Sequence, residues 1–193
     1  MTKQIALFIS RLVHPLVILT FFVFYSNIKI QESSQALVTI AAMIGLTIIP
    51  LTLWNWIKLK QGVYHNFDVS VREQRYSMFG FVFLLAGLLI AYLYLSEQPR
   101  EIRLGSLLMI QVIVLSFLVN FRLKSSLHLA VCSYIALGLV PLNPTWSVVL
   151  AAAIPLLAWS RVHLGRHRWI EVATGTFIGS FTGVQLLYQL DFL

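Results

Sequence analysis

The sequence contains little charge, one cysteine and two aspartates, and each shortage excludes a class of protein. Charged residues make up 11% of its 193 residues, less than half of the roughly 25% that is usual in soluble domains. Cys132 is the single cysteine, which excludes a disulfide framework and a thiolate metal cluster. Asp68 and Asp191 are the only aspartates. Enzymes of prenyl transfer bind magnesium pyrophosphate with clusters of aspartates, so this class is excluded as well.

Apolar sequence fills most of what remains, because 59% of the residues are hydrophobic. Several of its runs approach the roughly 20 residues that span a bilayer. We therefore predict an all-α, polytopic membrane helix bundle of about seven helices, forming one domain over residues 1–193. Arg11 interrupts the first run and no small-residue cleavage site follows Tyr25, so we expect a retained helix, kinked at Pro15, and not a signal peptide. The expected runs are 5–25, 36–57, 78–95, 104–121, 126–139, 146–159 and 168–187.

Basic residues are distributed unevenly between the two ends of these runs. If the seven runs alternate across a membrane, the polar segments 58–76, 122–128 and 160–171 all emerge on one face. In a membrane protein the formal net charge of +7 indicates orientation rather than nucleic-acid binding. Only Lys29, Arg100 and Arg103 lie on the other face. The remaining eleven lie on the face of the three segments: Lys3, Arg11, Lys58, Lys60, Arg72, Arg75, Arg122, Lys124, Arg161, Arg166 and Arg168.

The segment 160–171 contains residues that are suited to phosphate and proton chemistry. If His167 opens the following helix, Glu171 lies one turn further along the same face. A carboxylate there keeps one imidazole nitrogen protonated and leaves the other as a nucleophile. Arg161, six positions before His167, offers a planar fork for anionic oxygens. Three glycines at intervals of four, at 175, 179 and 183, allow another helix to approach this last helix closely.

The segment 122–128 precedes another expected helix. Ser126 and His128 occupy its first turn, where backbone N–H groups and the helix dipole favour an anion. Lys124 lies two residues upstream. One histidine that attacks phosphorus, a second that protonates the leaving oxygen and cations that hold the other oxygens suit phosphate-ester chemistry without a metal or another cofactor.

These segments together resemble the type 2 phosphatidic acid phosphatase superfamily. Ser160-Arg161, five residues, His167, three residues and Glu171 is similar to the third signature of the family, which reads Ser-Arg, five residues, His, three residues, Asp. Lys124-Ser-Ser126-Leu-His128 resembles the second signature, Pro-Ser-Gly-His.

The residues from Asp68 to Arg75 resemble the first signature, which is usually Lys, six residues, Arg, Pro. Asp68 stands in place of the lysine and Tyr76 in place of the proline. We expect Arg72 or Lys124 to supply the missing cation. Small bacterial members with similar first and second motifs look like this chain, which implies a multi-pass protein of the bacterial inner membrane.

The resemblance implies a six-helix phosphatase core plus one helix, and a phosphohistidine mechanism. His167 is then the nucleophile, Glu171 orients it, and His128 is the general acid. It also implies that Arg161, Arg75 and Ser126, with Arg72 or Lys124, bind phosphate on a lipid such as phosphatidic acid, phosphatidylglycerophosphate or a polyprenyl phosphate.

Two alternatives and one conflict stay open. A lipid phosphotransferase would use the same residues, whereas a catalytically degenerate protein would use the cations only to bind anionic membrane lipids.

The other histidines, His14, His65 and His163, are expected to be structural or to face the headgroups. The excess of basic residues favours a cytoplasmic site, although most of the family works on the outer face. The sequence predicts no nucleic-acid partner and leaves the oligomeric state open.

Overall fold

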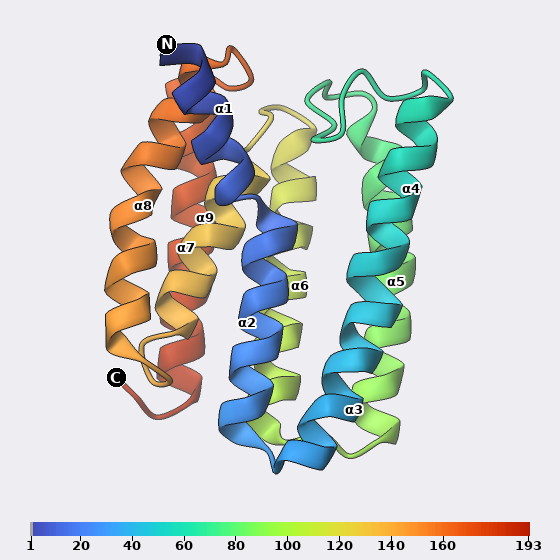
Figure 1. The fold of residues 1–193 in the computed structure, drawn as a ribbon, viewed down its shortest axis with the longest axis vertical. Coiled ribbons are helices and arrows are strands. Elements are labelled where there is room, and N and C mark those ends of the chain that lie inside the picture. The colour runs from blue at the N-terminus through green and yellow to red at the C-terminus, as the bar shows by residue number, and fades with distance from the viewer. Residues whose placement is uncertain (1) are drawn as a thin grey trace. The chain divides into compact units, whose positions relative to one another are not determined.

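The fold is all-helical, as a computed structural model shows for residues 2–193 (Figure 1). In this part of the chain α1 and α2 form one helical segment, α3, η1 and α4 form a second, and five single helices follow. This confirms the prediction of an all-α fold with about seven helices. The elements are α1 Thr2–Leu12, α2 Pro15–Ile30, α3 Ser33–Met43, the π-helical η1 Ile44–Ile48, α4 Ile49–Lys60, α5 Arg75–Leu95, α6 Arg100–Asn120, α7 Leu127–Gly138, α8 Pro144–His163 and α9 Trp169–Gln189.

Prolines account for the irregularities of the first two segments. Pro15 is the first residue of α2, a position that proline favours because its missing N–H has no partner in a helix anyway. The expected kink is therefore a break, since α1 ends at Leu12 and α2 starts at Pro15. Pro50 follows the π-helical turn Ile44–Ile48. Proline cannot donate to the carbonyl four residues earlier and its ring crowds that carbonyl, so a locally wider turn accommodates it.

Five of the helical segments in the described part of the chain are long and apolar enough to cross a membrane. This composition is that of a multi-pass membrane protein. The helix α7 has 12 residues, a length of about 18 Å at 1.5 Å per residue, which is less than the roughly 30 Å hydrocarbon core of a bilayer. The helix α9 has 21 residues but carries glycine, threonine and glutamine along its length. The five spans are Thr2–Ile30, Ser33–Lys60, Arg75–Leu95, Arg100–Asn120 and Pro144–His163.

The chain divides into two compact units. The first unit comprises the residues up to Phe22 together with Leu104–Leu193, and the second comprises Val23–Arg103. Both boundaries fall inside helices, in α2 and in α6, and neither coincides with a loop.

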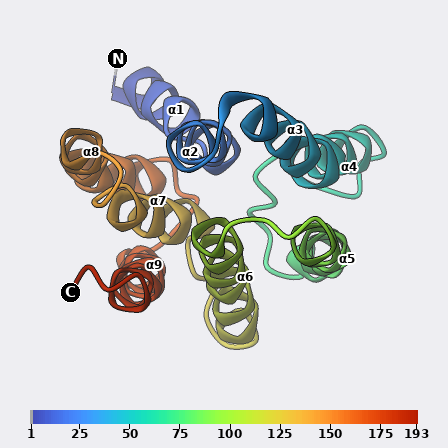
Figure 2. The ribbon, with the colours of Figure 1, turned by 90° about the horizontal axis from the view of Figure 1, so that it is seen from below.

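In the first unit the short helix α7 packs most closely against α9, and Figures 1 and 2 show these two helices side by side. The three glycines of α9 make this approach possible. A Cβ atom at Gly175 would overlap the carbonyl oxygen of Ser126, and one at Gly179 would overlap that of Ala130. Gly183 lies against the side chain of Leu137. The close helix approach predicted from the glycine spacing is thus present, and it brings the start of α9 to the start of α7.

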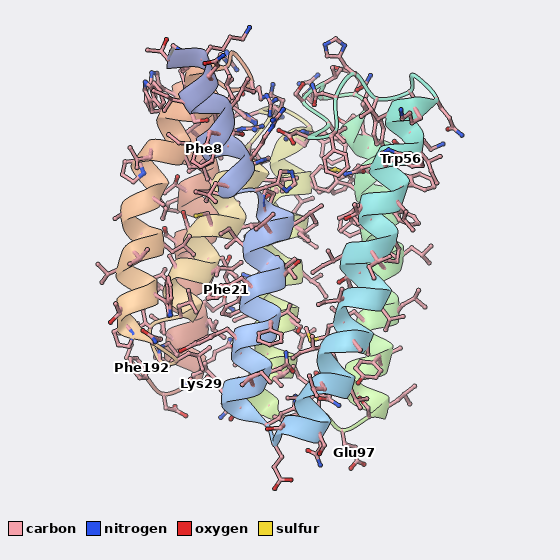
Figure 3. All side chains as sticks on the ribbon, viewed as in Figure 1. Phe8, Phe21, Lys29, Trp56, Glu97 and Phe192 are labelled. Carbon is pink, nitrogen blue, oxygen red and sulfur yellow. The ribbon has the colours of Figure 1, made fainter. Side chains whose placement is uncertain are left out.

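The second unit has polar groups at the ends of its helices. Figure 3 shows Trp56 near one end of α4 and Lys29 and Glu97 at the opposite end of the unit. Lys58 lies 4.8 Å from the centre of the Trp54 ring, and Lys60 lies 5.9 Å from that of Trp56. Indole rings beside ammonium groups are typical of the boundary between hydrocarbon and headgroups.

Candidate active site

His167 and Glu171 form a buried pair before and within the first turn of α9. His167 Nδ1 lies 3.0 Å from Glu171 Oε2, and the two residues are 5% and 6% exposed. The condition under which this contact is expected, that His167 opens the helix, is not met, because α9 begins at Trp169. The pair forms nevertheless, since the glutamate side chain reaches back past the helix start. A carboxylate at Nδ1 favours the tautomer with its proton on that nitrogen, which places the lone pair on Nε2.

Glu171 also begins its own helix. Its Oε2 accepts a hydrogen bond from the backbone N–H of Arg168, the residue before α9, at 3.2 Å, and its Oε1 lies 3.2 Å from Nε of Arg168. A glutamate at the third helical position that accepts from the N-cap backbone is half of a capping box. The glutamate at this position, which is aspartate in the signature that the segment resembles, bonds both the helix start and the imidazole.

Lys124 approaches the same carboxylate. Its Nζ donates to the backbone carbonyl of Arg166 at 2.9 Å and lies 3.8 Å from Glu171 Oε2. The ammonium group therefore joins the segment 122–128 to the segment 160–171. This position is compatible with the predicted role of Lys124 as a substitute cation, and that role stays a prediction.

Arg161 links the two histidines of the candidate site. It lies in the last turn of α8 and is fully buried. Its Nη1 donates to Ser10 Oγ at 2.8 Å and lies 3.4 Å from His128 Nε2, while its carbonyl accepts the backbone N–H of His167 at 3.2 Å. Because guanidinium groups only donate, this contact is a hydrogen bond when His128 is neutral and has its lone pair on Nε2. Ionised side chains are costly to bury in membrane proteins, so a buried arginine is a candidate for a functional role.

Ser126 and His128 lie at the start of α7, as the sequence predicts. Ser126 is the residue before the helix, and its backbone N–H donates to the carbonyl of Glu171 at 3.0 Å. Its hydroxyl is fully buried and makes no hydrogen bond within residues 2–193. The first-turn N–H groups of α7 and the positive end of its dipole lie beside this hydroxyl, and these groups favour an anion.

The remaining predicted phosphate ligands, Arg72 and Arg75, belong to the second unit. Arg75 is buried at the first position of α5, and its Nε donates to the carbonyl of Val69 at 3.0 Å. Arg72 Nε lies 3.5 Å from Glu73 Oε1, and the Arg72 side chain is 42% exposed. Their part in binding phosphate stays a prediction.

His163 and His65 have surroundings that differ from those of the buried His167. His163 is exposed and its ring stacks on Trp159, with ring centres 5.0 Å apart. His65 is exposed as well, and its backbone N–H donates to Gln74 Oε1 at 3.0 Å. Exposed rings of this kind suit residues that face headgroups.

Sequence reasoning missed the contribution of α1 to the site. Ser10 accepts from Arg161, and the carbonyl of Ala6 accepts from Ser160 Oγ at 2.6 Å. The ring of His14 packs against that of His128, with ring centres 5.0 Å apart. A signal was present in the small residues Ala6 and Ser10, which lie one helical turn apart on one face of an otherwise bulky helix.

Comparisons with family models, with curated proteins and with solved structures find no match for this chain. The resemblance to the type 2 phosphatidic acid phosphatases therefore depends on the spacing of the motifs. The geometry around Arg161 is a separate observation about this chain.

Proposed function

We propose that this chain is an integral-membrane lipid phosphate phosphatase that works through a phosphohistidine intermediate. The observation that carries the proposal is the position of Arg161, whose guanidinium touches His128 and whose carbonyl holds the backbone of His167. A phosphate group bound by this guanidinium therefore lies beside the imidazole of His128, the second imidazole of the site after that of His167. Planar guanidinium groups suit the paired oxygens of phosphate.

In the first step Nε2 of His167 attacks the phosphorus atom. The bond from phosphorus to the ester oxygen breaks as the N–P bond forms, and the leaving alcohol takes a proton from His128, which enters this step as the doubly protonated imidazolium and leaves it neutral. Glu171 holds the Nδ1 proton and stabilises the positive charge that develops on the ring of His167. Arg161, the hydroxyl of Ser126 and the first-turn N–H groups of α7 bind the other phosphate oxygens.

In the second step water replaces the alcohol. His128, now without its proton, accepts one from the water as the water oxygen attacks phosphorus. The N–P bond breaks, inorganic phosphate leaves, and both histidines return to their starting states. None of these steps requires a cofactor.

The substrate class follows from the setting of the site. Five apolar helical segments place the chain in a membrane, so the proposed substrate is a lipid phosphomonoester or pyrophosphate with an acyl or prenyl tail. The proposed location is the inner membrane of a bacterium, and the proposed family is the one that the motifs resemble.

The test is phosphate release by the purified protein in detergent, over a panel of phosphatidic acid, phosphatidylglycerophosphate and a polyprenyl phosphate. We expect release by the wild type and a loss of at least a hundredfold in the variant His167→Ala, because covalent catalysis needs its nucleophile. His163→Ala is the matched control, since this exposed histidine lies in the same segment and should leave the rate unchanged.

Two results would oppose the proposal. Equal release by His167→Ala and the wild type rules out the phosphohistidine route, and no release from any lipid phosphate favours a protein that only binds anionic lipids. Transfer of labelled phosphate to an added lipid alcohol would identify a phosphotransferase that uses the same intermediate.

A further inference from the structure

His14 lies at the break between α1 and α2, and the steps proposed above do not use it. Its Nδ1 accepts the backbone N–H of Leu16 at 3.2 Å. This side chain therefore caps α2, in the way that an asparagine or a serine often does. An Nδ1 that accepts a hydrogen bond carries no proton, so the neutral ring has its proton on Nε2. The cap fixes the orientation of the ring relative to the helix.

The fixed ring packs against His128. The two ring centres are 5.0 Å apart and the ring planes are inclined by 83°, an edge-to-face arrangement that aromatic rings favour. The Nε2 atom of His128 is at the same time 3.4 Å from Arg161 Nη1. The orientation of the His128 ring is thus constrained both by a ring from the α1–α2 break and by a guanidinium from α8.

We propose that His14 is a positioning residue for His128, which directs the general acid toward the leaving oxygen. The inference rests on the proposed function, because it assigns His14 a part in the first step of that reaction. A general acid must lie within hydrogen-bond reach of the oxygen that it protonates. An imidazole that loses its packing partner can turn about its side-chain bonds, and small errors in placement lower the rate strongly.

Because His14 is proposed to position the residue that protonates the leaving oxygen, its effect on the rate should depend on whether the leaving group needs a proton. A lipid alkoxide needs a proton to leave, whereas p-nitrophenolate is a stable anion and leaves without one. The comparison uses kcat/KM, which covers the steps up to release of the alcohol and excludes hydrolysis of the phosphohistidine. The substrates are a short-chain phosphatidic acid and p-nitrophenyl phosphate, with the full chain in detergent.

Two variants separate the ring contact from the cap. His14→Asn keeps an acceptor for the N–H of Leu16 and removes the ring, so α2 stays capped. We expect its kcat/KM to fall roughly tenfold on phosphatidic acid and less than twofold on p-nitrophenyl phosphate. His14→Phe keeps a ring against His128, and we expect it to restore most of the rate on phosphatidic acid. The exposed His163, changed to Asn, is the control and should behave as the wild type.

The possible results distinguish this inference from the function on which it depends. A selective loss in His14→Asn with recovery in His14→Phe supports the inference. An unchanged rate, an equal loss on both substrates, or a loss in His14→Phe as large as in His14→Asn overturns it. If the wild type releases no phosphate, or if His167→Ala is as active as the wild type, the proposed function itself fails.

Discussion

The two units hold their buried arginines in different ways. In the first unit Arg161 lies at the end of α8 and receives its contacts from Ser10 in α1 and His128 in α7, which are far from it in sequence. In the second unit Arg75 donates to Val69, six residues away. Val69 has a φ of 47°, an unfavourable conformation for a β-branched residue. The contacts of the first guanidinium thus come from other helices, whereas the contact of the second with Val69 lies within one loop.

This difference indicates where each unit is sensitive to change. Helix packing is fixed by side-chain volume at close approaches, so a single added methyl group can displace a residue that lies a helix away. A loop-held group instead responds to substitutions within the loop itself.

The largest effect is expected at the glycines of α9. Gly179→Ala places a methyl group on the carbonyl of Ala130. The two helices must then separate, and we expect a loss of about 2 kcal/mol or more in the free energy of unfolding, together with lower phosphatase activity. Gly87→Ala in α5 is the control, because nothing lies within 4 Å of a Cβ atom there. Thermal unfolding in detergent measures the stability of both variants. Equal losses would show that helix packing in the first unit is no more sensitive to an added methyl group than packing in the second.

A smaller effect is expected at Arg75. Arg75→Lys removes the Nε that donates to Val69 and the planar fork that suits phosphate, so we expect kcat/KM on phosphatidic acid to fall roughly tenfold. Arg72→Lys should have little effect, since Arg72 is partly exposed and pairs with Glu73 at 3.5 Å. The reverse order would make Arg72 the phosphate ligand of the loop.

The smallest effect is expected at two glycines with positive φ. Gly165 lies in the turn before His167 with a φ of 67°, and Gly62 follows α4 with a φ of 72°. Alanine at either position costs about 1 kcal/mol, because the left-handed conformation crowds its Cβ. We expect similar losses of thermal stability but a lower kcat only in Gly165→Ala, which shifts His167. A similar fall in kcat for Gly62→Ala would contradict this expectation.

Much of the fold was readable from the sequence because its signals are local. Apolar runs of nearly constant length predict helices, and Pro15 marks a break in the first of them independently of how the helices pack. The spacing of His167 and Glu171 predicts their contact, although the reason differs from the one expected. Their hydrogen bond depends on a glutamate at the third position of α9 that reaches back to its N-terminus, and not on two residues that share a helical face.

The sequence alone determined the helices, their apolar character and the order of the three polar segments, since these properties depend on near neighbours in the chain. Only the tertiary structure decided that Ser10 would meet Arg161 and that His14 would meet His128. These contacts join residues more than a hundred positions apart. They depend on how closely helices pack, which is set in part by where glycines admit a neighbouring backbone, and residue spacing along the chain does not contain that information.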